Sequence, residues 1–107
     1  MRTAHRGGRM LVAAARFDLR VPGCTSLKEK RHVVKTLIAS LRGTFNVGVA
    51  EVDHQDLWQR TAIGVSAVAG ERYHLTKVMH EIERHVERFP GVELIDAEVS
   101  LHAPDDE

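Results

Sequence analysis

The chain has 107 residues, of which 43 % are hydrophobic and 28 % are charged, and its formal net charge is zero. These values predict one globular domain with one core and exclude an intrinsically disordered chain. Cys24 is the only cysteine, which excludes an internal disulfide framework. We find no export signal, so we expect a cytoplasmic protein, and no membrane segment because the apolar run at 10–15 is too short.

Six elements are predicted between two tails, from alternation of period two and apolar spacing of period 3.6. The first nine residues form a flexible basic arm, and 103–107 form an acidic tail. The predicted strands are 10–20, 45–52, 57–69 and 92–102, and the predicted helices are 26–42 and 71–88.

The order strand-helix-strand-strand-helix-strand predicts an α+β domain over 10–102. Two right-handed crossovers interleave in such a chain, which gives a four-stranded antiparallel sheet with both helices on one face. This architecture is the ferredoxin-like sandwich.

The first helix carries its own start and stop signals and a one-sided charge. Ser26 and Glu29 form a capping-box pattern, and Gly43 predicts the end. Lys30 points toward the apolar arc, where we expect its stem to follow the sheet edge and its amine to reach water. Four basic side chains fall within an arc of about 60° at helical pitch. This basic stripe consists of Lys28, Arg31, Lys35 and Arg42.

Three sequence strings stand out, VPGCTSLKEKR at 21–31, FNV with VAEV at 45–52, and QDLWQR at 55–60. Together they resemble the YlxP-like family of small bacterial proteins of unknown function. The resemblance extends over about 10–102. It implies a ferredoxin-like fold, a bacterial cytoplasm, and genes that lie among those for translation initiation and ribosome maturation. It implies no established activity, so no catalytic residue and no cofactor is carried over.

Metal and thiol chemistry are not favoured. His74, His80 and His85 are spaced by six and five residues, whereas helical metal pairs need three or four. Cys24 lies near a helix start, where a thiolate is stabilised, but it has no neighbouring histidine. We therefore expect no metal and no catalytic nucleophile.

A distant enzyme alternative is an acylphosphatase-like site. The loop at 21–26 feeds a helix N-terminus, which can hold a phosphate, and Asn46 on the next strand could mimic the asparagine of those enzymes. The loop does not reproduce their glycine-rich sequence, which makes incidental anion binding the simpler interpretation.

The loop between the second and third strands has two interpretations. Glu51, Asp53, Asp56 and Arg60 surround it, which is typical of a turn held by Asx-type bonds and a salt bridge that Trp58 partly covers. Alternatively it is a partner-binding tip, with Trp58 and Arg60 as the anchors.

The open sheet face lacks the aromatic residues on which RNA-recognition domains stack bases. Its small apolar residues instead predict a homodimer interface, with Arg16 and Glu98 paired at the rim. The predicted interface residues are Val12, Ala14, Ala62, Gly64 and Val68.

Charge separation gives the leading functional hypothesis. Residues 26–43 hold five basic side chains and one acidic, whereas 92–107 hold six acidic and no Lys or Arg. A neutral protein with separated poles can bind an anion at one of them. We therefore expect a non-enzymatic protein that binds ribosomal RNA or a ribosomal subunit through the basic stripe. The alternatives are a solvated helix face, and a homodimeric protein-interaction module without a nucleic-acid role.

Overall fold

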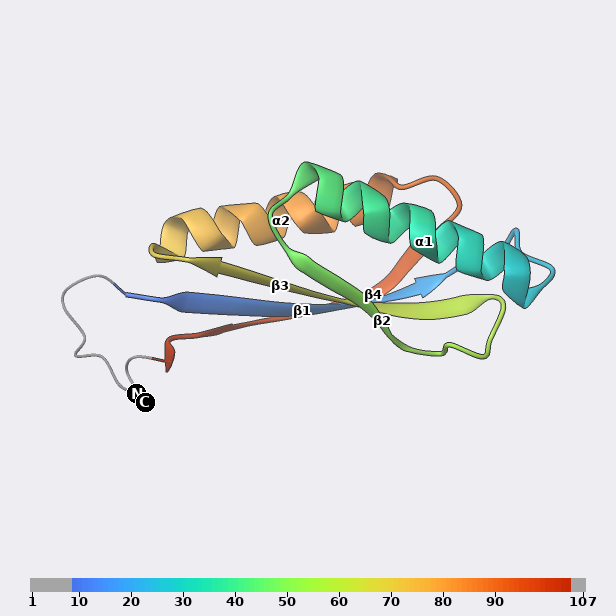
Figure 1. Ribbon diagram of the computed structural model, residues 1–107, viewed down its shortest axis with the longest axis horizontal. Helices are drawn as coiled ribbons and strands as arrows, with labels where there is room; N and C mark the ends of the chain where they lie inside the picture. The colour runs from blue at the N-terminus through green and yellow to red at the C-terminus, as the bar shows by residue number, and fades with distance from the viewer. Residues whose placement is uncertain (1–8, 105–107) are drawn as a thin grey trace.

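A computed structural model describes residues 9–104, so most of the predicted arm and part of the acidic tail lie outside the described residues. The predicted element order and the ferredoxin-like α+β fold are confirmed (Figure 1). The sheet order is β2-β3-β1-β4 with every neighbouring pair antiparallel. The elements are β1 Leu11–Arg20, α1 Leu27–Thr44, β2 Gly48–Asp53, β3 Arg60–Ala69, α2 Arg72–Arg88 and β4 Glu93–His102.

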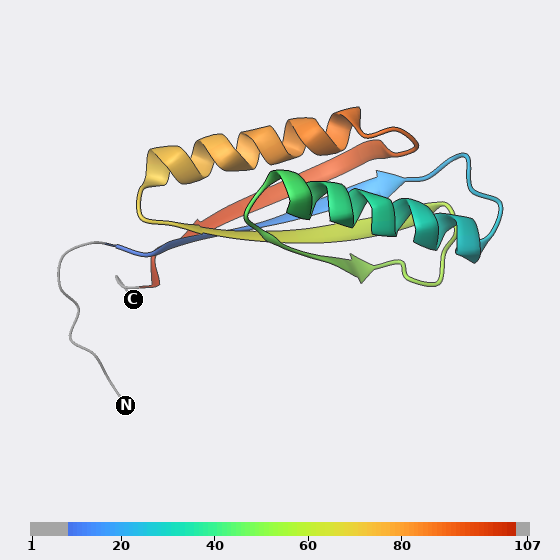
Figure 2. The same cartoon turned by 45° about the horizontal axis from the view of Figure 1, so that its top comes forward.

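Both helices cover one face of the sheet, with α1 toward β2 and α2 toward β4 (Figure 2). The core between these layers is built from alternate residues of the strands and one stripe of each helix, as the periodicities predict. The largest fully buried apolar side chains are Phe17, Leu19, Val21, Leu37, Leu41, Ile63, Leu75, Met79, Ile82 and Val86. Neither helix covers the opposite, open face (Figure 1).

The start of α1 follows the predicted capping pattern with one change. The Ser26 hydroxyl accepts a hydrogen bond from the Glu29 backbone N–H at 3.2 Å. The Glu29 carboxylate reaches Thr25 instead of Ser26, accepting from its backbone N–H at 2.7 Å and its hydroxyl at 2.6 Å. These bonds hold the pKa of Glu29 below its ordinary value. The helix N-terminus is thus capped by side chains of the chain itself.

Three boundaries differ from the prediction. Helix α1 continues through Gly43, and the Phe45 N–H closes its last turn on the Leu41 carbonyl at 2.9 Å. Strand β2 therefore begins only at Gly48, and β3 begins at Arg60. The loop between them spans 54–59 and is longer than predicted.

Strand β4 is the less covered edge of the sheet. None of its residues is buried, and Ile95, predicted to point inward, is 44 % exposed because the β1–β4 register skips it at a bulge. A bulge shifts the following side chains relative to the pleat and so cannot be read from alternation alone.

Candidate functional site

Lys30 is the central residue of the site, and its predicted exposure is wrong. Its side chain is completely buried, and its amine donates to the Glu51 carboxylate at 2.6 Å. It also donates to the backbone carbonyls of His54 at 3.0 Å and Gln55 at 3.3 Å. An ammonium group has three protons, so all of them are satisfied. A buried lysine needs such partners. Lys30 finds them because it lies on the apolar arc of α1, which faces the sheet.

The Lys30 contacts fix the 54–59 loop against the N-terminal part of α1. Glu51 also accepts a bond from the buried Thr61 hydroxyl at 2.7 Å, which ties β2 to β3 at the same point. His54 has a φ of 61°, in the left-handed region that a non-glycine residue adopts at a cost. Its backbone N–H donates to Asp53 at 2.7 Å while its carbonyl binds Lys30. The lysine therefore holds the loop in this conformation.

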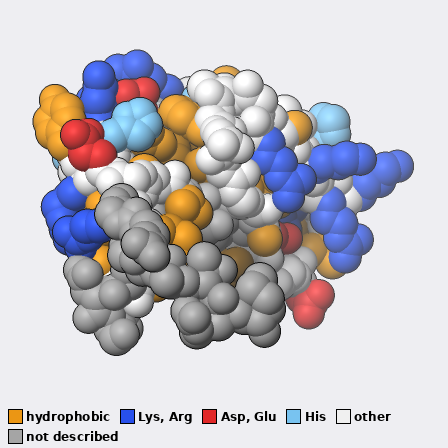
Figure 3. Space-filling view, turned by 60° about the vertical axis from the view of Figure 1, so that its left-hand side comes forward, with side chains coloured by type: hydrophobic (Ala, Val, Ile, Leu, Met, Phe, Trp, Pro, Cys, Tyr) orange, Lys and Arg blue, Asp and Glu red, His pale blue; other side chains and the backbone are white. Residues whose placement is uncertain are grey.

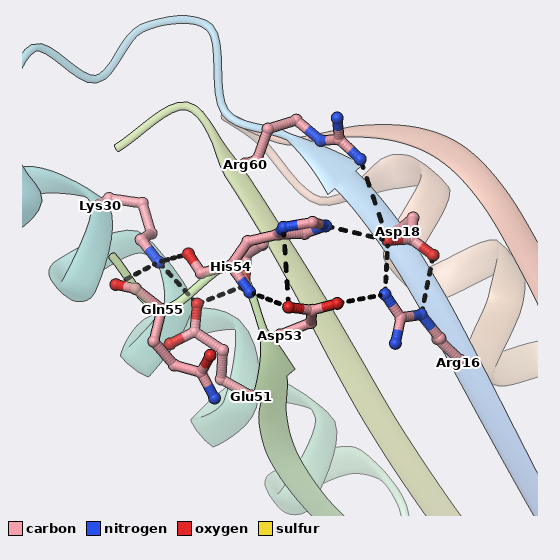
Figure 4. A network of polar contacts seen from close by, with 9 residues as sticks. Arg16, Asp18, Lys30, Glu51, Asp53, His54, Gln55 and Arg60 are labelled. Carbon is pink, nitrogen blue, oxygen red and sulfur yellow. Dashed lines mark hydrogen bonds and ion pairs between the residues drawn. The ribbon is translucent and has the colours of Figure 1, made fainter. Parts of the chain in front are cut away.

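A second polar cluster occupies the open face beside this loop (Figure 4). The Arg16 guanidinium contacts Asp18 at 3.0 Å and Asp53 at 3.0 Å, bridging β1 to the end of β2. The His54 ring lies 3.6 Å from Asp18, and Arg60 lies 4.0 Å from it. Hydrogen bonds from Arg16 lower the pKa of both aspartates, and the carboxylates raise the pKa of Arg16.

This cluster corrects the predicted Arg16–Glu98 pair. The two residues are neighbours across the β1–β4 register, but the guanidinium turns toward Asp18 and Asp53 instead. It also places the loop carboxylates Glu51 and Asp53 on different sides of the sheet. Glu51 faces the helix side with Lys30, whereas Asp53 faces the open side with Arg16. The sheet separates them.

Sequence reasoning missed both clusters, although one signal was present. Lys30 falls on the apolar arc of α1, and Glu51 follows the buried Val49 by two residues on the strand. Opposite charges at two core-facing positions predict a buried pair. The sequence gives no comparable signal for the Arg16 cluster. This cluster forms only because the end of β2 and Asp18 of β1 lie on either side of Ala62 in the sheet.

The basic stripe lies along an exposed side of α1. Figure 3 shows Lys and Arg side chains gathered on the right, on the side of the molecule where α1 lies. Lys28, Arg31 and Lys35 are exposed, and within residues 9–104 no salt bridge engages them. Arg42 differs, because its guanidinium donates to the Val49 carbonyl at 2.9 Å. The structure thus leaves three stripe cations uncommitted and places the fourth against edge strand β2.

Trp58 lies on the loop, 49 % exposed, beside the equally exposed Leu57. Leu57, Trp58, Gln59 and Arg60 line a hollow of about 340 Å³. Gln59 donates to the Cys24 carbonyl at 3.2 Å, and the Val21 N–H donates to the Gln59 carbonyl at 2.9 Å. The tip is therefore anchored to the turn that precedes α1, while its tryptophan faces solvent.

Two of the predicted dimer-interface residues are less accessible than expected. Ala62 is fully buried, because its neighbours across the sheet, Asp18 and Asp53, belong to the polar cluster that covers it. A Cβ on Gly64 would come within 2.9 Å of the Val52 side chain, so Val52 lies over Gly64.

The other three predicted interface residues lie toward the opposite end of the face. Val12 and Val68 are partners across the β1–β3 register, and Val68 is 65 % exposed. Ala14 is also exposed. The accessible apolar part of the open face is therefore this end, away from the polar cluster.

The acylphosphatase-like arrangement is not assembled. Asn46 precedes β2 and lines a hollow with Val68 and His74, at the opposite end of the sheet from loop 21–26. The Glu29 carboxylate occupies the start of α1, where a phosphate would bind. Cys24 is buried, and burial raises the pKa of its thiol. Burial thus opposes the thiolate form at this position.

A candidate metal centre is equally lacking in the described part of the chain. Residues 9–104 contain no group of three His, Cys, Asp or Glu side chains placed to hold an ion. In the same range, neither helix has the length and apolar character needed to cross a membrane.

Residues 12–99 match the family model described as Protein of unknown function (DUF503), and the chain belongs to that family. It is 38 % identical over 68 residues to the Uncharacterized protein YlxP of Bacillus subtilis (strain 168). That match covers 64 % of this chain and 74 % of the relative. The predicted family is thereby confirmed, and it carries no established activity.

Proposed function

We propose that this protein is a non-enzymatic, cytoplasmic RNA-binding protein that contacts ribosomal RNA, free or within a ribosomal subunit, through the basic stripe. The observation that supports it most is the state of Lys28, Arg31 and Lys35. These three cations share one exposed side of α1 and are not neutralised by carboxylates of residues 9–104. Phosphates neutralised by lysine and arginine supply most non-specific affinity for nucleic acid.

The contrast with α2 strengthens the proposal. On α2, Arg72, Lys77, Arg84 and Arg88 alternate with Glu81, Glu83 and Glu87. Such mixed charge is typical of a solvated helix surface. On α1 the only acidic residue is Glu29, which is engaged by Thr25, and the basic Lys30 is removed from the surface by burial. The exposed charge of α1 is therefore predominantly positive.

The test compares two matched charge reversals. Arg31→Glu with Lys35→Glu should weaken binding to ribosomal RNA strongly, while Arg84→Glu with Arg88→Glu should weaken it much less. Affinity is measured by filter binding at low salt, with sedimentation of the native protein alongside ribosomal subunits at low and high salt. Equal losses from both pairs would mean that generic charge is responsible. The absence of binding by the native protein at low salt would overturn the proposal.

A second candidate is a homodimeric protein-interaction module without a nucleic-acid role. One observation favours it, the exposure of 65 % at Val68 on the uncovered sheet face next to Val12. A concentration-dependent dimer together with no RNA binding would select this candidate.

A further inference from the structure

The tip of the 54–59 loop combines a planar aromatic surface with an unusual arginine pair. Arg20 at the end of β1 and Arg60 at the start of β3 are direct partners across the sheet. Like charges placed opposite each other on neighbouring strands are destabilising. Both side chains are accessible, with exposures of 56 % for Arg20 and 39 % for Arg60.

Nearby carboxylates neutralise the positive charge of this pair only in part. Arg20 lies 3.5 Å from Glu93, whose side chain is itself 58 % exposed. Arg60 lies 4.0 Å from Asp18, but Asp18 already accepts two hydrogen bonds from Arg16, at 3.0 and 3.2 Å. The Arg60 Nε atom is buried and has no hydrogen-bond partner among residues 9–104. The pair is therefore short of acceptors.

Trp58 adjoins Arg60, one member of this pair. It lies two residues before Arg60, and both line the same hollow of about 340 Å³. Guanidinium groups bind phosphate oxygens in a bidentate geometry, and an exposed indole offers a face on which any base can stack. A ligand that is both planar and anionic satisfies this site best.

We propose that Trp58, Arg20 and Arg60 form a subsite for one unpaired nucleotide of a bound RNA, with the base on the indole and a phosphate on the arginines. This rests on the proposed function and adds to it a preference for single-stranded segments. Lys30 ties the loop to α1 between the stripe residues Lys28 and Arg31. The subsite thus lies at the end of the molecule where the basic stripe begins.

The experiment uses the fact that Trp58 is the only tryptophan of the chain. Its intrinsic fluorescence is followed while the full-length protein is titrated with a short single-stranded RNA, and separately with a duplex of the same sequence. We expect quenching by the single strand and little change with the duplex. Trp58→Ala should weaken single-strand binding about 5- to 150-fold, the range that corresponds to one stacked base. Trp58→Phe should retain most of the affinity, and Arg60→Gln should lower it.

Control experiments distinguish failure of the Trp58 subsite from failure of RNA binding through the basic stripe. Tyr73→Ala removes an aromatic side chain that is 76 % exposed on α2 and should leave binding unchanged. If the native protein binds RNA but Trp58→Ala binds equally well and no quenching occurs, the subsite is overturned and the stripe proposal stands. If a polyglutamate peptide quenches Trp58 and RNA does not, the tip is a protein-binding site and the inference fails. No RNA binding by the native protein overturns both.

Discussion

Lys30 and Glu51 join helix α1 to strand β2 through a 2.6 Å ion pair, and the lysine side chain is completely buried. The amine also holds two carbonyls of the loop that follows β2. One side chain therefore sets the position of both surfaces for which we propose a role. On α1, Lys30 lies between the stripe residues Lys28 and Arg31. Trp58 lies on the loop that Lys30 anchors.

The first prediction concerns this pair. Lys30→Met should lower the free energy of unfolding by about 3–5 kcal/mol, because Glu51 is left with a partly buried, unpaired charge. Lys28→Met, two residues away and exposed, should change the free energy of unfolding by no more than about 0.5 kcal/mol. Urea unfolding followed by circular dichroism measures both. Adding Glu51→Leu to Lys30→Met should recover part of the loss, and equal stability of the two single variants would contradict the assigned role.

The second prediction concerns acid sensitivity. Arg16 lowers the pKa of Asp18 and Asp53 below their ordinary value of 3.8. A lowered carboxyl pKa in the folded state stabilises the protein above the unfolded pKa, and this stability is lost as the pH falls through the folded pKa. The stability difference between the native protein and Arg16→Gln should therefore be constant from neutral pH to about pH 5 and shrink below about pH 4.

Urea unfolding at a series of pH values tests this directly. Arg84→Gln, an exposed change on α2, serves as the control and should show no such pH dependence. A difference between the native protein and Arg16→Gln that is as large at acidic as at neutral pH would contradict the assignment of the carboxylates.

The third prediction ranks the residues of the basic stripe. Arg42 is held by the Val49 carbonyl, so Arg42→Met should weaken RNA binding less than Arg31→Met does. With three uncommitted cations, the slope of log affinity against log salt on a duplex should be about −2.7. Filter binding over a range of salt concentrations gives both quantities. A larger effect from Arg42 would show that RNA displaces its contact with β2.

The fourth prediction concerns the homodimer interface on the open sheet face. Ala62 is fully buried beneath the polar cluster, so Ala62→Glu should unfold the protein instead of merely separating subunits. Val68→Glu, at a site that is 65 % exposed, should give a folded monomer. Sedimentation velocity and circular dichroism distinguish the two results. Native protein that is already monomeric at micromolar concentration would exclude this interface.

The sequence by itself determined the fold and the local chemistry of α1. The alternation of the strands, the apolar spacing of the helices and the Ser26 cap depend on neighbours within a few residues, so they can be read without tertiary contacts. The basic stripe follows from helical pitch for the same reason. The element order and the Ser26 cap are confirmed. The element boundaries differ, because the closing bond from Phe45 to Leu41 carries α1 past Gly43.

Only the tertiary structure decided which charged groups are surface groups. Lys30 and Arg42 both lie on α1, yet Lys30 is buried against Glu51 and Arg42 donates to a backbone carbonyl of β2. Arg20 and Arg60 are forty residues apart and meet only through the β1–β3 register. Ala62 is hidden by side chains from two other strands. Each outcome depends on how segments that are distant in the sequence align in the fold, which local periodicity does not encode.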